Sequence, residues 1–261
     1  MRRTTKPPAG AFCWFELGTT DAKAADAFYG RVFGWSVEHN DMGPGGLYHM
    51  YSLHGANVAA AWTMPPEMRA QGIPPHWLVY IAVDDADAAA AAVTRLGGTV
   101  LNGPFDVEEH GRMVMAKDPG GAAFALWQAK RNIGIGIAGE PGSMCWSELA
   151  TRDAAQAIAF YTGLVPWTPK ASSTSPAPSY TEWLLDGASI GGMLPMSAEW
   201  GDMAPHWMTY IMVDDADATC AAIRAAGGSV PHGPFDAPGV GRLAVCADPQ
   251  GAHFSVIRLA M

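Results

Sequence analysis

The sequence is poor in charge and in long apolar runs, and each shortage argues against a class of protein. Charged residues make up 16% of the 261 residues, and the formal net charge is −9. This acidic balance argues against nucleic acid or an anionic membrane surface as a partner, because both need a basic footprint. No apolar run approaches the roughly 20 residues of a membrane-spanning helix, and the opening MRRTTKPPAG lacks the apolar stretch of a secretory signal. We therefore expect a cytoplasmic protein with no membrane partner.

Cysteine and the common catalytic motifs are also scarce. The four cysteines, Cys13, Cys145, Cys220 and Cys246, show no C-x-x-C spacing, which favours reduced core residues over a disulfide framework or a zinc site. The sequence has no nucleophile elbow, no phosphate-cradling glycine loop and no dinucleotide-binding fingerprint. The glycine-rich segment GIGIAG (134–139) is not bracketed by a strand and a helix, so we interpret it as linker.

What the sequence does contain is a long internal repeat. Residues 12–35 return at 144–167, and residues 75–128 return at 205–258 with about half of the positions identical and no gap. A repeat of this length is a duplicated domain rather than a solenoid unit. The expected organisation is an N-terminal tail (1–11), a first domain (12–128), a linker (129–143) and a second domain (144–258).

Each copy divides again into two units of the order β-α-β-β-β. In the first unit, the alternating FCWFEL (12–17) predicts a strand, and Asp21 or a neighbouring threonine caps a helix that ends at Gly34. Segments 47–54 and 57–64 predict a hairpin. The second unit repeats the order with a strand at 76–84, a helix capped by Asp84 or Asp85, and strands at 99–102, 112–117 and 122–127. The stretches expected to be irregular loops are 39–46 and 169–179.

Short motifs recur in the same order in both copies: T-x-D before A-x-x-F-Y, a V-D-D-A-D-A helix start, and a D-P-x-G turn before the last strand. This order resembles the glyoxalase/bleomycin-resistance/dioxygenase superfamily, also called the vicinal oxygen chelate superfamily. Within it, the chain is most similar to actinobacterial tandem-domain proteins labelled glyoxalase-like or hydroxylase. The matching residues are Asp21, Phe28, Tyr29, Asp84, Asp85, Gly97, Gly98, Asp118, Pro119 and Gly121, with Asp153, Phe160, Tyr161, Asp214, Asp215, Gly227, Gly228, Asp248, Pro249 and Gly251 in the second copy.

The resemblance covers nearly the whole chain and implies an α+β fold. In such a fold, two βαβββ units pair edge to edge into a cupped, barrel-like mixed sheet that holds the ligand. Four units therefore predict two tandem cups. The fold does not settle the chemistry, because the superfamily hosts lyases, epimerases, dioxygenases and drug-sequestering proteins.

Metal-using members of the superfamily hold a divalent ion with His, Gln, Glu or Tyr from the first and last strands of each unit. A count along this sequence puts other side chains there, so we expect no metal at the family site and no cofactor. A displaced site on His76 and Glu16 stays open, and a two-residue shift in register would put Glu16 on a ligand position. The counted positions are Trp14, Leu78, Ala125, Trp146, Met208 and Ser255.

Alternate residues of a strand share one face, so the expected cup lining is apolar with a few inward polar groups, which is typical of a small-molecule pocket. The candidate catalytic residues are Glu16 and Glu148. The candidate substrate-binding residues are Trp14, His76, Leu78 and Tyr80 in the first copy and Trp146, His206, Met208 and Tyr210 in the second.

Each candidate also has a purely structural interpretation. The tryptophans stack on a flat ligand or fill the place where relatives hold an ion. The glutamates act as acid or base with a raised pKa, or form ion pairs with Arg112 or Arg242. The histidines relay a proton or bond to a loop at the rim, and the tyrosines bond a ligand or fill the cup.

Three functions remain open. The first is binding of a small aromatic or carbonyl-bearing molecule without turnover. The second is a metal-independent lyase, isomerase or hydroxylase-type enzyme in which the glutamates move a proton. The third is the divalent-metal chemistry of a glyoxalase or dioxygenase. In each case the expected partner is a small molecule, and a homodimer is an open alternative.

Overall fold

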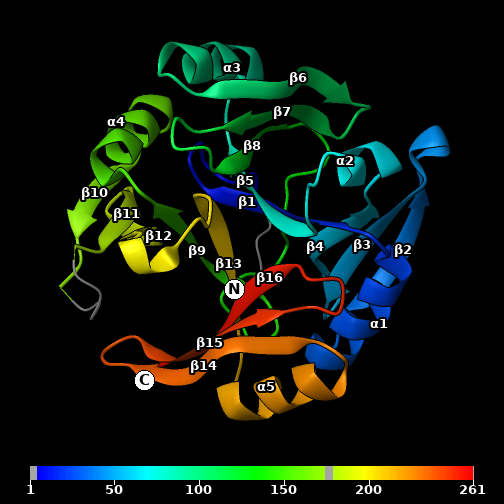
Figure 1. Ribbon diagram of the computed structural model, residues 1–261. Helices are drawn as coiled ribbons and strands as arrows, with labels where there is room; N and C mark the ends of the chain where they lie inside the picture. Colours follow the sequence, from blue (N-terminus) through cyan, green and yellow to red (C-terminus); the bar gives the residue numbers. More distant parts are fainter. Residues whose placement is uncertain (1–4, 174–178, 261) are drawn as a thin grey trace.

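The computed structural model describes residues 5–173 and 179–260 and contains two repeats of strands and helices (Figure 1). The first repeat consists of β1 (Phe12–Thr19), α1 (Ala22–Phe33), β2 (Ser36–Asp41), β3 (Leu47–Leu53), β4 (Ala56–Thr63), α2 (Pro66–Ala70), β5 (His76–Ala82), α3 (Ala86–Arg95), β6 (Thr99–Val107), β7 (Gly111–Lys117) and β8 (Ala123–Ala129). The second consists of β9 (Met144–Thr151), α4 (Ala154–Leu164), β10 (Thr168–Ala171), β11 (Thr181–Leu185), β12 (Ala188–Pro195), β13 (His206–Met212), α5 (Ala216–Ala225), β14 (Ser229–Ala237), β15 (Gly241–Ala247) and β16 (His253–Leu259).

Each repeat forms one eight-stranded mixed sheet. The strand orders are β2-β3-β4-β1-β5-β8-β7-β6 and β10-β11-β12-β9-β13-β16-β15-β14. The two units of a repeat join where β1 runs antiparallel to β5 and where β9 runs antiparallel to β13. The α+β fold with two tandem sheets is therefore confirmed. Both sheets keep two free edges, however, so neither closes into a barrel.

The four longer helices, α1, α3, α4 and α5, begin where the sequence predicts. The Asp21 and Asp85 side chains each accept a hydrogen bond of 2.9 Å from the backbone N–H three residues ahead. Asp153 and Asp215 do the same in the second repeat, at 2.9 and 3.0 Å. These caps satisfy backbone donors that a helix start leaves free. Gly34 ends α1 in the left-handed region, with φ of 72°.

Two segments expected to be loops contain edge strands instead. The expected loop 39–46 begins inside β2, whose sequence SVEHND is polar and almost wholly exposed. The expected loop 169–179 begins inside β10, and its residues 174–178 lie outside the described part of the chain. A strand at a sheet edge with both faces solvated has no apolar alternation to reveal it.

The two repeats interlock through their first helices. The hydroxyl of Tyr29 on α1 donates to Asp248 in the D-P-x-G turn of the other repeat, at 3.1 Å. Tyr161 on α4 donates to Asp118 at the same distance. Accordingly, α1 lies beside α5 and α4 beside α3 on opposite sides of the molecule (Figure 1). Two of the motifs shared by the repeats therefore bond to each other across the domain boundary.

The segments that precede the first strand of each repeat pack into the same interface. Trp35 Nε1 donates to the Gly142 carbonyl and Trp167 Nε1 to the Gly10 carbonyl, both at 2.7 Å. Gly10, expected in a loose tail, is buried. In the linker, Gly134 has φ of +100°, and any Cβ there would collide with the Cys13 carbonyl oxygen.

The cysteines lie mostly in the core, as their spacing predicted. Cys13, Cys220 and Cys246 are buried and Cys145 is partly buried, and none of the four forms a disulfide. No helix in the described part of the chain is long and apolar enough to cross a membrane.

Candidate functional site

The inner face of the first sheet carries a pocket of about 380 Å³, which we call the first cup. Its volume falls within the range of about 300–1,000 Å³ that is typical of small-molecule sites. Two tryptophans and two tyrosines give it broad aromatic walls around the Glu16 carboxyl. The lining residues are Trp14, Glu16, Asn40, Asp41, Met42, Tyr48, Met50, Tyr80, Val107, Glu108, His110, Met113, Trp127 and Asn132.

A chain of hydrogen bonds crosses this pocket from β1 to β3. Trp14 Nε1 donates to the Tyr48 hydroxyl at 3.0 Å, and that hydroxyl donates to Glu16 Oε2 at 2.9 Å. Trp14 and Glu16 are two apart on β1 and share its inner face. Tyr80 lies directly opposite Trp14 on β5. The sequence-predicted trio of Trp14, Glu16 and Tyr80 is thus brought together in one pocket.

The second sheet repeats the arrangement on the corresponding face, which we call the second cup. Trp146 Nε1 donates to the Tyr180 hydroxyl at 3.0 Å, and Tyr180 donates to Glu148 Oε2 at 2.7 Å. Tyr210 donates to Glu148 Oε1 at 2.9 Å. Each cup therefore holds one glutamate against a tryptophan-bonded tyrosine and a second tyrosine.

Burial dominates the electrostatics of both glutamates. It raises the pKa of Glu16 above its usual value, while hydrogen bonds from Tyr48, Tyr80 and Trp62 act in the opposite direction. Burial also raises the pKa of Glu148, opposed by Tyr180 and Tyr210. No basic side chain is among the causes of either shift, so each carboxyl is held by neutral donors.

The arginines expected as partners of the glutamates lie elsewhere. Arg112 forms a two-pronged pair with Asp87, at 2.7 and 2.9 Å, and also contacts Asp106 at 3.4 Å. Arg242 does the same with Asp217 and Asp236. The ion-pair interpretation of Glu16 and Glu148 is therefore wrong: the guanidinium groups are drawn to carboxylates near the surface.

Sequence reasoning missed one tyrosine in each cup. Tyr48 on β3 and Tyr180 just before β11 are the residues that bond the tryptophan to the glutamate. Tyr180 follows a stretch expected to be irregular. Tyr48 is the second residue of the predicted strand 47–54, whose sequence LYHMYSLH has no clean apolar alternation to show which way it faces. Their equal offset from Trp14 and Trp146, 34 residues in each case, was the available signal.

The remaining candidates lie at the margin of the cups. His76 Nδ1 is 2.9 Å from the Pro74 carbonyl oxygen, and His206 Nδ1 is 2.9 Å from that of Ala204. These are the loop bonds of a rim residue, and burial lowers the pKa of His206. Leu78 is buried opposite Glu16, and Met208 packs beside Tyr210.

Comparison with known proteins is decisive for the family. The sequence profile of the Glyoxalase/Bleomycin resistance protein/Dioxygenase superfamily matches residues 12–126 and 134–256. The chain belongs to this superfamily. It is 44% identical over 250 residues to "Putative glyoxylase CFP32" of Mycobacterium tuberculosis, covering 95% of this chain and 94% of that one. It is 37% identical over 266 residues to "Anthracycline biosynthesis protein DnrV" of Streptomyces peucetius, covering 98% and 95%.

Solved structures share the fold of this chain at low sequence identity. The Mn(II)-bound glyoxalase of Novosphingobium aromaticivorans has a TM-score of 0.65 at 16% identity, covering 95% of this chain and 82% of that one. The 2,3-dioxygenase LapB of Pseudomonas sp. KL28 has a TM-score of 0.67 at 12% identity, covering 98% and 94%. At these identities the likeness concerns the fold alone.

The superfamily's metal positions can be compared with the residues present. Of the counted positions in the first repeat, Leu78 lies opposite Glu16, and Trp14 and Ala125 both lie beside Tyr80 in the strand register. Within the described residues, a single group of three His, Cys, Asp or Glu side chains brings its ligand atoms together, and it lies outside the cup. That group consists of Asp26, His39 and His49.

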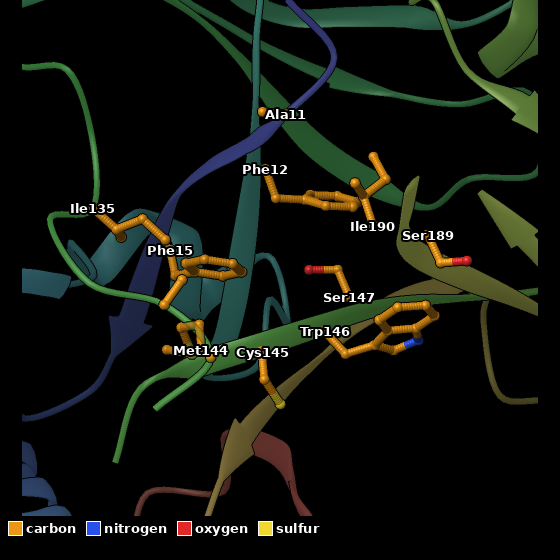
Figure 2. A pocket seen from close by; sticks show the side chains of 12 residues that line it. Ala11, Phe12, Phe15, Ile135, Met144, Cys145, Trp146, Ser147, Ser189 and Ile190 are labelled. Atoms are coloured by element: carbon orange, nitrogen blue, oxygen red, sulfur yellow. The ribbon is translucent and has the colours of Figure 1, made fainter. Parts of the chain in front are cut away.

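A second pocket, of about 240 Å³, lies between the two repeats (Figure 2). Phe12 and Phe15 of β1, Ile135 of the linker and Ile190 of β12 make it largely apolar. Ser147 of β9 also lines it, and its hydroxyl is buried with no hydrogen-bond partner among the described residues. This pocket is smaller than the first cup and has no ionisable side chain apart from Cys145.

Proposed function

We propose that the first cup binds a flat, carbonyl-bearing aromatic molecule, and that the second cup binds one in the same way. The observation that carries this proposal is the pairing of aromatic walls with a single polar cluster in one pocket. Indole and phenol rings offer rigid apolar area for stacking. The Tyr48 hydroxyl accepts from Trp14 and donates to Glu16, so it keeps one lone pair to accept from a ligand hydroxyl. The Tyr80 hydroxyl, 3.7 Å from the Met113 sulfur, can turn to donate to a ligand oxygen.

The proposed binding needs no metal ion. Glu16 is a single carboxylate held by phenol and indole donors. The counted positions Trp14, Leu78 and Ala125 carry none of the ligand types that metal-using members place there, so the residues present do not fit the family's divalent ion. We therefore derive no step through a metal.

The relatives support the ligand class. DnrV and DauV are both named as anthracycline biosynthesis proteins, and the chain aligns with each over 98% of its length. An anthracycline is built on fused aromatic rings that carry carbonyl and hydroxyl oxygens. Such a molecule matches a pocket with aromatic walls and few polar groups.

Titration with alizarin, a planar dihydroxyanthraquinone, tests the proposal. We expect heat of binding in calorimetry and quenching of tryptophan fluorescence. Trp14→Phe keeps a ring but removes the Nε1 donor, and Glu16→Gln keeps the shape but removes the acid. Each should weaken binding about tenfold, since one hydrogen bond contributes roughly 1.4 kcal/mol or less. Unchanged affinity in both variants would contradict binding in this cup.

A second function is favoured by the raised pKa of the two glutamates. A carboxyl of this kind suits proton transfer beside a carbonyl group. In D₂O, the protein should accelerate exchange of the α-protons of 2-tetralone, an aromatic ketone, as followed by NMR. The Glu16→Gln/Glu148→Gln double variant should lose at least about 100-fold of that acceleration. Equal exchange by the double variant would exclude catalysis and leave binding.

A further inference from the structure

A cluster of two histidines and one aspartate lies on the outer face of the first sheet, behind the cup. His39 of β2 stands directly opposite His49 of β3 in the antiparallel register. Their rings are 4.6 Å apart and nearly perpendicular, at 78°. Asp26 projects onto this pair from α1, so three elements contribute one side chain each.

The ligand atoms of this cluster already converge. Asp26 Oδ2 is 2.9 Å from His39 Nε2 and 2.8 Å from His49 Nδ1. All the ligand atoms lie within 4.8 Å of one another. The side chains of Asp26 and His49 are 12% and 6% exposed, while that of His39 is 46% exposed. The cluster is therefore buried on its inner side and open to solvent beside His39.

The carboxylate is also held from behind. The hydroxyl of Tyr51 on β3 donates to Asp26 Oδ1 at 2.9 Å. Oδ2 contacts both imidazoles, and His49 Nδ1 also lies 2.9 Å from Oδ1. Hydrogen bonds of this kind to a ligating carboxylate are a regular feature of metal sites, because they fix its orientation. Tyr51 is buried, so its position is set by the core.

We propose that Asp26, His39 and His49 bind one divalent transition-metal ion of the Zn²⁺ class. Two imidazoles and one carboxylate suit Zn²⁺, and three protein ligands with one water are a common tetrahedral set. Ligands about 2.0–2.1 Å from the ion stand roughly 3.3 Å from one another. The observed 2.8 and 2.9 Å contacts therefore need to open by about half an ångström. Water reaches the fourth position from the open side beside His39.

The site is separate from the cup. His49 and Tyr51 face α1, whereas their neighbours Tyr48 and Met50 line the first cup on the other side of β3. A bound ion ties the exposed edge strand β2 to α1. The same strand contributes Asn40 and Asp41 to the cup wall, so the ion steadies that wall without touching the ligand.

The second repeat offers an internal contrast. Trp35 and Trp167 mark an offset of 132 residues between the copies. At this offset the counterparts of Asp26, His39 and His49 are Ile158, Ala171 and Thr181. None of these side chains is a usual Zn²⁺ ligand. The proposal therefore predicts one ion per chain rather than two.

Calorimetric titration of the EDTA-treated, dialysed full chain with ZnSO₄ tests the proposal. We expect one Zn²⁺ per chain. His39→Ala and Asp26→Asn should weaken binding at least 100-fold, and Tyr51→Phe about 10–100-fold. Two controls should bind like the parent: His54→Asn, which removes a histidine from the β3–β4 turn, and Glu16→Gln, which alters the cup.

Substitution of Co²⁺ gives a second readout. A tetrahedral site with two nitrogen ligands produces visible absorption bands, which should vanish in His39→Ala. His39 is half-exposed, so this variant should unfold in EDTA at the same temperature as the parent. Three results would overturn the proposal: no binding, equal binding by His39→Ala, or binding lost only in Glu16→Gln. The last would place the ion in the cup.

Discussion

The two repeats are most alike inside their cups and much less alike on the outer face of the same sheets. Both cups join a tryptophan, a tyrosine and a glutamate through the same hydrogen bonds. On the outer face, Asp26 and Tyr51 of the first repeat correspond to Ile158 and Trp183 of the second. The buried Trp183 Nε1 has no hydrogen-bond partner within the described chain.

This contrast distinguishes residues that only fill the core from residues that have a function. A carboxyl buried among aromatic rings is unfavourable unless it is well hydrogen-bonded, and apolar side chains would be enough if the cup were only part of the core. The second repeat accepts apolar filling on its outer face, where Ile158 and Trp183 lie. It keeps Glu148, Tyr180 and Tyr210 inside the cup. That pattern favours ligand binding in both cups and a proposed metal site in the first repeat alone.

The largest expected effect on stability comes from replacing the tryptophans of the two cups. Trp14 is 4% exposed, whereas Trp146 is only partly buried. Trp14→Ala should lower the free energy of unfolding by about 3–5 kcal/mol, and Trp146→Ala should lower it clearly less. Urea denaturation monitored by circular dichroism measures both. Equal losses would show that the two cups are packed alike after all.

The two hydrogen-bonded tyrosines at the interface between the repeats should contribute equally to stability. Tyr29 and Tyr161 each donate to a buried aspartate and accept from a tryptophan Nε1, Trp77 or Trp207. Tyr29→Phe and Tyr161→Phe each remove the hydrogen-bond partner of two buried polar groups. Each variant should lower the free energy of unfolding by about 2–4 kcal/mol. Urea midpoints of the two variants give the comparison. A loss in only one of them would break the symmetry of the interface.

The pH dependence of stability should reveal the buried glutamates. The folded-state pKa of Glu16 and Glu148 is raised above the ordinary 4.5, so the folded chain holds their protons more tightly than the unfolded chain. Their contribution to stability is complete below that ordinary value and is lost as pH rises through the raised folded-state pKa.

Melting temperatures measured from pH 5 to pH 8 test this. Glu16→Gln and Glu148→Gln should each flatten the decline with rising pH, and comparison with the parent cancels the contributions of other groups, including His206. Exposed Asp87 and Asp217, whose pKa is lowered by arginine hydrogen bonds, act in the opposite sense at lower pH. A parallel decline in parent and variants would contradict burial of the glutamates.

The smallest effect is expected at the arginines. Arg112 and Arg242 pair with exposed aspartates, so solvent and salt screen the attraction. Arg112→Gln and Arg242→Gln should leave alizarin affinity and the pH dependence unchanged, with at most a slight fall in melting temperature. A loss of affinity comparable to that of Glu16→Gln would mean that the guanidinium acts on the cup.

The sequence predicts the parts of this fold that follow local rules. The repeat, the aspartate caps and the shared face of Trp14 and Glu16 depend on spacing along one strand or helix. That Tyr80 shares a face with His76 and Leu78 also follows from alternation along β5, whereas its register opposite Trp14 depends on how β1 and β5 pair. The edge strand β2 does not, since its polar sequence has no buried face.

Contacts between distant elements were beyond the sequence pattern. The cluster of Asp26, His39 and His49 depends on α1 packing over a β2–β3 pair that the sequence did not indicate. The bonds of Tyr29 to Asp248 and of Tyr161 to Asp118 join residues 219 and 43 positions apart. The ion pair of Arg112 with Glu16, one of the two interpretations, was wrong because the choice of an arginine among several carboxylates depends on exposure, which spacing alone does not give.

A crystal structure of the chain grown with alizarin would show whether the first cup binds a flat aromatic ligand. We expect density for the ring system in the pocket lined by Trp14 and Trp127, with a ligand oxygen at the hydroxyl of Tyr48 or Tyr80. Density confined to the pocket between the repeats, or a cation coordinated by Glu16, would contradict it.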